Sequence, residues 1–316
     1  MRIFLTGASG VVGRRLVPML RNAGHDVTAV VRSVAASGML ERQGATVVNV
    51  DLFERETVRA AVAGHDVVIN LATHMPRSTA LMFVPWAWHQ NDKLRSVASN
   101  MLVDACLAAD VPRFVQESFA PAYPHSANQW IDETTPLSPV RYNASLLDAE
   151  GAAERFSRSG GSGVVLRFGA FYGIDAQQTS DLVEWIQHGR APLPGPPNAY
   201  ISSISHDDAA RATAAAVALP AGVYNVVDDE PVTHRVFVDS LATGLGVDPP
   251  RLPPTWLTPL FGPLGRLIAR SVRVSNRKLR LACGWTPKYP SVREGWEAIL
   301  DLLELDSDFG AHERHA

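Results

Sequence analysis

Residues 6–13 have the types and spacing of a phosphate-binding turn. This glycine-rich run follows a β-type segment at 2–5 and opens a helical pattern at 11–22. Gly7 permits a tight turn, Gly10 lets the backbone approach a pyrophosphate, and Gly13 lets helix and strand pack closely. The free N–H groups and positive dipole of the helix N-terminus attract phosphate. We therefore predict a dinucleotide site formed by Thr6, Gly7, Ser9, Gly10, Val11, Val12 and Gly13.

Arg32 bears on which dinucleotide this turn binds. An acidic side chain at the end of the second strand would accept the ribose 2′-hydroxyl and repel a 2′-phosphate. The sequence there reads Val30-Val31-Arg32-Ser33, without a carboxylate. A guanidinium is always charged and has a planar fork of donors suited to phosphate. The alternative is that Arg32 is an ordinary solvated loop residue. The sequence favours NADP(H) over NAD(H).

The glycine spacing and a series of later motifs resemble the extended branch of the short-chain dehydrogenase/reductase family, which is epimerase/dehydratase-like. Two residues separate Gly7 from Gly10, as in that family's Thr-Gly-x-x-Gly-x-x-Gly. The further matches, in the family's order, are Asp51-Leu52, Asn70-Leu71-Ala72, Asn91, Leu166-Arg167-Phe168 with Tyr172-Gly173, Asp207-Asp208-Ala209-Ala210-Arg211, and Gly284-Trp285-Thr286-Pro287. The resemblance covers nearly the whole chain, and it is stronger evidence for the fold than for the reaction.

This resemblance implies further cofactor contacts. Asp51 would meet the adenine amino group, and the segment after the fourth strand would flank the cofactor. The residues implied are Asp51, Leu52, Leu71, Ala72, Thr73, Asn91, Tyr142 and Phe168.

The catalytic residues of the resembled family are only partly present. The family uses Tyr-x-x-x-Lys on one helix face, since residues four apart are neighbours there, together with a Ser or Thr at the end of strand five. Tyr142 matches the tyrosine, but the lysine position is Leu146, and the serine position is Phe119. Ser118 is adjacent to it, yet neighbours on a strand point to opposite faces. We take Tyr142, Ser118 and Ser145 as the catalytic candidates. The alternative for Tyr142 is that it only anchors a helix.

Without the lysine, the phenol of Tyr142 would keep an ordinary pKa of about 10 and be protonated at neutral pH. It could then donate a proton to a carbonyl oxygen but would be a poor base for oxidising a hydroxyl. Such a site favours reduction.

Candidate substrate residues lie where strands end, because parallel α/β sheets bind ligands at their carboxyl edge. They are His74, Arg77, Phe119 and Tyr172. Glu117 would be a base if burial raised its pKa, although a salt-bridged surface glutamate is the simpler interpretation.

Short β-type runs alternate with helical patterns in the first half of the chain, which is typical of a Rossmann-type doubly wound parallel sheet. We expect strands at 2–5, 27–31, 46–50, 67–69, 113–116 and 164–167, and helices at 11–22, 54–63, 91–109 and 142–158. Prolines interrupt the later segments. We expect a dinucleotide-binding core at 1–167, which strands at 201–204 and 223–227 rejoin, and a smaller substrate lobe at 168–200 and 228–316.

The composition excludes several classes of protein. The 316 residues carry 19% charged residues and a net charge of −3, which does not favour disorder or nucleic-acid binding. No apolar run is long enough for a membrane span. Neither the two cysteines nor the histidines have metal-ligand spacing. We expect no metal and no signal peptide, a cytoplasmic location, a small-molecule substrate, and the homodimer that the resemblance implies through the helices at 91–109 and 142–158.

Three functions are compatible with these observations. The first is an NADP(H)-dependent oxidoreductase that reduces a carbonyl-type group of a small molecule. The second is a nucleotide-sugar epimerase or dehydratase, which must first oxidise a hydroxyl and so needs the base that Leu146 removes. The third is an NADP(H)-binding sensor that has lost catalysis.

Overall fold

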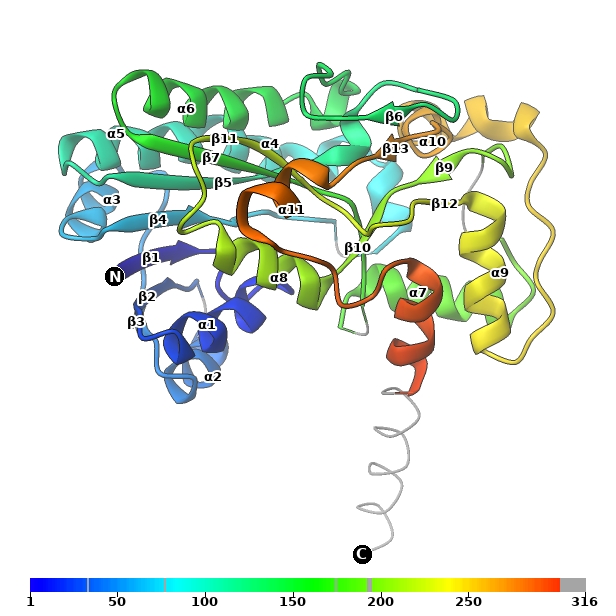
Figure 1. Ribbon diagram of the computed structural model, residues 1–316, viewed down its shortest axis with the longest axis horizontal. Coiled ribbons are helices and arrows are strands. Elements are labelled where there is room, and N and C mark those ends of the chain that lie inside the picture. The colour runs from blue at the N-terminus through cyan, green and yellow to red at the C-terminus, as the bar shows by residue number, and fades with distance from the viewer. Residues whose placement is uncertain (33, 77, 174, 192–194, 302–316) are drawn as a thin grey trace, which may run out of the picture.

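The computed structural model describes residues 1–32, 34–76, 78–173, 175–191 and 195–301 (Figure 1). Across these residues, seven parallel strands form the main sheet in the order β11-β7-β5-β4-β1-β2-β3. Its strands are β1 (Arg2–Thr6), β2 (Asp26–Val30), β3 (Thr46–Val48), β4 (Val67–Asn70), β5 (Arg113–Phe119), β7 (Ser162–Phe168) and β11 (Gly222–Val226). The order reverses at β1, so the predicted doubly wound Rossmann-type sheet is confirmed.

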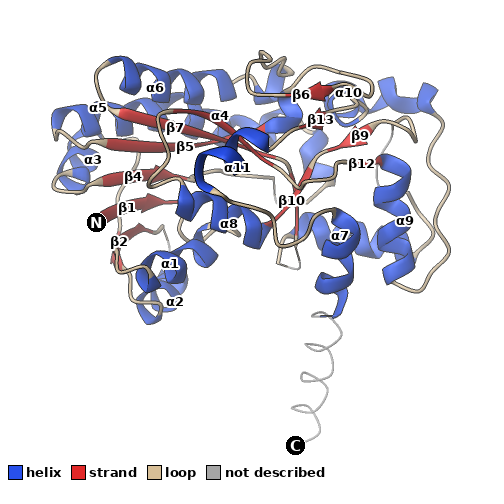
Figure 2. Ribbon diagram, in the orientation of Figure 1, coloured by secondary structure: helices blue, strands red, loops and turns tan. Residues whose placement is uncertain are grey.

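Helices cover both faces of this sheet, as Figure 2 shows. One face packs on α1 (Gly13–Asn22), α2 (Val34–Arg42), α8 (His206–Ala215) and α11 (Arg277–Cys283). The other packs on α3 (Arg55–Val62), α5 (Ser99–Ala108) and α6 (Leu146–Arg158). All four β4 residues are buried because parallel strands between two helical layers face no solvent.

A contact from another segment compensates for the proline inside α1. Pro18 has no N–H, so the carbonyl of Arg14 loses its helical donor. The Gln43 side chain, from the end of α2, donates to that carbonyl at 3.2 Å. The helix that supports the glycine turn therefore stays regular.

The predicted helix at 91–109 is interrupted in a way that the sequence does not show. It consists of α4 (His89–Lys93), a π-helical turn at Leu94–Ala98, and α5. A π-helical turn adds a residue to the helical register and is frequent at functional sites. Here it carries the buried Arg95.

A smaller lobe lies beyond the carboxyl edge of the sheet, to the right in Figure 1. Its core combines α7 (Gln177–Gln187), α9 (His234–Gly244) and the last described helix, residues 292–301. Short strand pairs join the lobe to the sheet: β8 (Ala170–Tyr172) with β10 (Ser203–Ser205), β9 (Tyr200–Ile201) with β12 (Val232–Thr233), and β6 (Trp130–Ile131) with β13 (Arg273–Val274). The lobe also contains α10 (Gly262–Ile268), which packs near the 3₁₀ helix η1 (Ala80–Phe83).

Two sequence expectations differ from these elements. The segment at 223–227 joins the main sheet as β11, but 201–204 forms parts of β9 and β10, which lie in separate small sheets. The predicted helix at 142–158 begins only at Leu146, after a 3₁₀ turn at Arg141–Asn143. In the described ranges, no helix has both the length and the apolar content to span a bilayer.

Candidate functional site

The glycine turn has a backbone that only glycine allows. Gly7 has a φ of +71°, and a Cβ there would lie 2.9 Å from the Ala72 nitrogen and closer still to the Leu71 carbonyl. A Cβ on Gly13 would collide with the backbone of Ala8. No side chain caps the start of α1, and within the described residues the N–H groups of Val11, Val12 and Gly13 have no acceptor, so they are available. This cradle fits a pyrophosphate.

Buried side chains fix the position of the turn. Thr6, at the end of β1, donates its hydroxyl to the Asn70 Oδ1 at 2.6 Å. Asn70 in turn donates to Gln116 at 2.9 Å and to Ser99 at 3.2 Å. The network ties the carboxyl ends of β1 and β4 to the middle of β5 and to the start of α5, and it holds the segment that begins at Leu71 beside the turn.

The other predicted cofactor residues lie along the same edge of the sheet. Arg32 is exposed after β2 and, among the described residues, has no ion pair. Asp51 is exposed after β3 and accepts from the Phe53 N–H at 2.9 Å, next to Leu52. Asn91 is buried and accepts from the His74 N–H at 2.9 Å. Of the remaining predicted cofactor residues, Ser9 is exposed, Val12 and Phe168 are buried, and Ala72 and Thr73 are half-buried.

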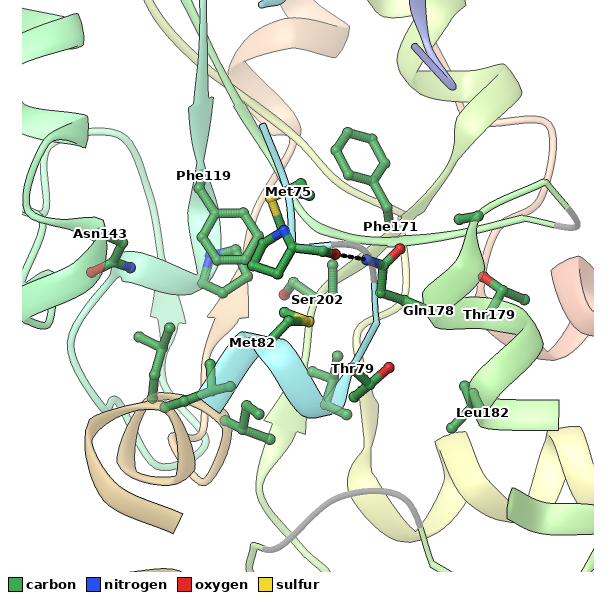
Figure 3. A pocket seen from close by; sticks show the side chains of 18 of the residues that line it. Met75, Thr79, Met82, Phe119, Asn143, Phe171, Gln178, Thr179, Leu182 and Ser202 are labelled. Atoms are coloured by element: carbon green, nitrogen blue, oxygen red, sulfur yellow. Dashed lines mark hydrogen bonds between the residues drawn. The ribbon is translucent and has the colours of Figure 1, made fainter. Parts of the chain in front are cut away.

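A cavity of about 610 Å³ begins beside Val11 of the glycine turn and extends into the lobe. Its wall is mostly apolar, and Figure 3 shows Met75, Met82, Phe119, Phe171 and Leu182 around it. Polar groups also reach the wall: Figure 3 shows Thr79 and Gln178, and Gln178 donates to the Pro76 carbonyl at 3.1 Å. The shape suits a small, largely apolar ligand next to a dinucleotide.

The predicted catalytic tyrosine position lies just before α6. The backbone of Tyr142 lies in the 3₁₀ turn, but its side chain is outside the described part of the structure. Leu146, in the lysine position, is fully buried. Ser145 donates its hydroxyl to Asp92 at 2.7 Å.

Sequence reasoning missed Asn143 beside this tyrosine. It is buried and lines the cavity, and its Oδ1 accepts from the Val140 N–H at 2.7 Å. Its Nδ2 has no acceptor in the described ranges. No motif marks it; only its place next to Tyr142 could have done so.

The two residues at the end of β5 have different surroundings. Ser118 contributes to the cavity wall, but its hydroxyl donates to the Glu150 carboxylate at 2.5 Å. Glu150 also receives a bidentate pair of hydrogen bonds from Arg167, at 2.8 and 2.7 Å. Phe119, at the family's serine position, packs its ring along the cavity (Figure 3).

Glu117 forms a salt bridge, as one interpretation of the sequence had it, but not at the surface. Arg95, from the π-helical turn, donates to its carboxylate at 2.9 and 3.2 Å, and both side chains are buried. The pair lines the cavity. Each side chain of the pair compensates the charge of the other.

Asp175 is a second compensated charge in the wall. Arg14, Arg15 at 2.6 Å, and His206 at 3.0 Å surround its carboxylate. Burial alone would raise the pKa of Asp175, but the hydrogen bonds from His206 and Arg15 outweigh it and hold that pKa well below its usual range.

The predicted substrate residues are divided between the cavity and its surroundings. Phe119 lines the cavity. His74 is half-buried on the segment after β4, and Arg77 is outside the described residues. Tyr172 is buried in the lobe core, 5.3 Å from the Trp296 ring between centroids.

No motif or spacing marks His234, at the start of α9, as a candidate. It lines the cavity and is 2% exposed. Burial lowers its pKa to about 4, which the nearby Ile268 backbone only partly offsets. The imidazole is therefore neutral at physiological pH.

The family model described as NAD(P)H-binding matches residues 7–220. The chain belongs to this family. A curated relative, the 3-diazoavenalumate denitrifying reductase of a Streptomyces species, is 34% identical over 312 residues, covering 93% of this chain and 99% of the relative. A ketoreductase of Stigmatella aurantiaca, which acts on 4-hydroxy-2-methyl-3-oxo-4-farnesyl-3,4-dihydroquinoline-1-oxide, is 28% identical and covers 78% of this chain and 74% of its own.

Among solved structures, the human epimerase family protein SDR39U1 with NADPH superposes with a TM-score of 0.75. It is 18% identical, and the match covers 95% of this chain and 99% of that one. At that identity the likeness shows the fold alone. The resemblance to the extended short-chain dehydrogenase/reductase family is confirmed at the level of the fold. The chain is an NAD(P)-binding, oxidoreductase-like protein.

Proposed function

We propose that this protein is an NADPH-dependent reductase of a small, largely apolar molecule, acting on a carbonyl-type group. The observation that carries the proposal is the 610 Å³ cavity that begins at Val11 and runs between the sheet edge and the lobe. A reducible group held there would lie next to a dinucleotide seated on the glycine turn. Both curated relatives are named as reductases, which supports the same class.

Gly7, Gly10 and Gly13 would hold the pyrophosphate, and the end of β7 and the segment after β4 would flank the rest of the cofactor. When bound, NAD(P)H supplies a hydride. The apolar wall, including Phe119, excludes water from the reacting atoms.

Polar groups near α6 bear on which proton transfer the site can support at neutral pH. Ser118 and Ser145 each donate their hydroxyl to a carboxylate, and Leu146 brings no charge. None of these three is a base for oxidising an alcohol. The phenol of Tyr142 and the amide of Asn143 are hydrogen-bond donors, which suit the oxygen of a carbonyl under reduction.

The preference for NADPH rests on Arg32. It is exposed at the end of β2, has no ion pair among the described residues, and has no neighbouring carboxylate in sequence to repel a 2′-phosphate. We expect Arg32→Gln to weaken NADPH binding about 10-fold and to leave NADH binding unchanged. Arg42→Gln, an exposed arginine at the end of α2, is the matched control. Equal affinities of the wild-type protein for both cofactors contradict the preference.

A second candidate reaction is the reduction of an aryl diazonium group, which the name of the Streptomyces relative suggests. Carbonyl reduction consumes a hydride and a proton. Replacing a diazonium group by hydrogen consumes a hydride and releases N₂, with no proton taken up. The occupied hydroxyls of Ser118 and Ser145 favour this reaction, because it needs no acid from the protein.

Turnover of a substrate panel separates these reactions. The panel contains aryl aldehydes, aryl ketones and arenediazonium salts, and the readouts are loss of NADPH absorbance and release of N₂. Tyr142→Phe lowers turnover of a ketone if the phenol donates the proton, and leaves turnover of a diazonium salt unchanged. Cofactor binding without turnover of any member contradicts a reductase and favours a sensor. Epimerisation of a nucleotide sugar without net NADPH consumption favours the epimerase alternative.

A further inference from the structure

Among the described residues, four charged side chains line the cavity, and three of them are compensated. Arg95 and Glu117 form their buried pair, and Asp175 is surrounded by two arginines and a histidine. The fourth is Arg270, two residues after the end of α10. No carboxylate lies within 4 Å of its guanidinium anywhere in the part of the chain that the structure describes. Arg270 therefore brings one uncompensated positive charge to a mostly apolar wall.

Backbone groups orient this guanidinium. Its Nη1 donates to the Tyr123 carbonyl at 3.0 Å and to the Ser138 carbonyl at 2.7 Å, both on the segment that follows β5. Arg270 is half-buried, and burial lowers its pKa without a carboxylate to offset that effect. The guanidinium stays charged even so, because arginine cannot be deprotonated in proteins at ordinary pH.

The other edge of the guanidinium remains available. Neither Nε nor Nη2 of Arg270 has a hydrogen-bond acceptor within the described residues, and neither is among the atoms buried without a partner, so both are accessible. The Nε and Nη2 donors are parallel and in one plane, which matches the two oxygens of a carboxylate. A fixed fork of this kind binds a carboxylate with two hydrogen bonds and little loss of side-chain freedom.

We propose that Arg270 is the carboxylate-binding residue of the substrate site, and that the natural substrate is a small, mostly apolar monocarboxylic acid. This inference rests on the proposed function, since the acid is the molecule to be reduced. One uncompensated charge balances one carboxylate, whereas a nucleotide diphosphate carries at least two negative charges. The apolar wall formed by residues such as Phe119 and Leu264 would contact the rest of the acid.

The experiment compares acids with their uncharged amides. Calorimetric titration of the NADP⁺-saturated protein would use trans-cinnamate, 3-phenylpropionate and octanoate, each against its amide, with UDP-glucose as a diphosphate probe. Binding of NADP⁺ is measured first, so a failure of the proposed cofactor site is seen separately. We expect at least one acid to bind about 10-fold or more tightly than its amide.

Variants then assign that difference to Arg270. Arg270→Gln should abolish the preference for the acid while leaving the amide affinity unchanged, and Arg270→Lys should keep part of it. Arg266→Gln, an exposed arginine on α10 outside the cavity wall, should change neither. NADP⁺ affinity of each variant checks that the protein is folded.

Three outcomes overturn the inference. One is that no acid of the panel binds more tightly than its amide. Another is that Arg270→Gln weakens acid and amide equally, which indicates only a structural role for its bonds to Tyr123 and Ser138. The third is that UDP-glucose binds in an Arg270-dependent way and the acids do not, which favours a nucleotide diphosphate.

Discussion

Alanine substitutions in the glycine turn separate folding from cofactor binding. Gly7→Ala places a Cβ at a φ of +71°, which costs about 1–2 kcal/mol. The same Cβ collides with the backbone of Leu71 and Ala72, which the pairing of β1 with β4 holds in place, and overpacking of this kind adds about 1–3 kcal/mol. We expect Gly7→Ala to lower the free energy of unfolding by about 2–5 kcal/mol and to abolish NADPH binding.

Gly10→Ala is the more informative of the two. Its φ is ordinary, and the nearest backbone atom to a Cβ is the Gly7 oxygen at 3.2 Å, so we expect a loss of stability within about 1 kcal/mol. That Cβ would stand where the pyrophosphate approaches the turn. Losing a hydrogen bond to a charged phosphate weakens binding by about 10–150-fold.

The assays are urea unfolding and titration of NADPH by fluorescence. Gly151→Ala is the control: this glycine is exposed within α6, with nothing within 4 Å of a Cβ, so the variant should gain about 0.5–1 kcal/mol and bind NADPH normally. Wild-type NADPH affinity in Gly10→Ala would refute the assignment of the turn to the pyrophosphate.

Three further outcomes follow from buried polar contacts. Ser118→Ala removes only the hydroxyl that binds Glu150, so we expect turnover within about 3-fold of the wild type; abolished turnover would make Ser118 a catalytic residue. Arg95→Gln leaves the Glu117 carboxylate buried and uncompensated, so urea unfolding should show that the free energy of unfolding falls by about 3–5 kcal/mol. A decrease below about 1 kcal/mol contradicts a tight pair. The pKa of His234 is about 4 in the folded chain and 6.5 in the unfolded one, so the unfolded chain takes up the proton first as pH falls. The free energy of unfolding, relative to that of His234→Gln, should therefore decrease by about 3 kcal/mol from pH 7 to pH 4, and a pH-independent difference rules out the buried neutral imidazole.

The glycine turn was visible in the sequence because a positive φ and a close backbone approach restrict the residue type at Gly7 and Gly13. Short apolar runs between helical patterns likewise predicted the core strands, since buried parallel strands are continuous apolar runs. The replacement of lysine by Leu146 was also readable, and its complete burial agrees with an apolar role.

Contacts between distant segments were not readable. Arg95 reaches Glu117 through a π-helical turn, and no spacing rule places an extra residue in a helix. Ser118 is engaged by Glu150, 32 residues away. Arg270 and His234 reach the cavity only because the lobe packs against the sheet edge. Proline-interrupted segments such as 249–263 carry no periodicity from which such positions follow.

The measurement that tests the account most directly is a crystal structure of the protein with NADP⁺ soaked in. We expect the pyrophosphate on the N–H groups at the start of α1 and the nicotinamide C4 inside the cavity, near Phe119 and Asn143. A nicotinamide directed away from that cavity, or a protein that binds neither NADP⁺ nor NAD⁺, would contradict it.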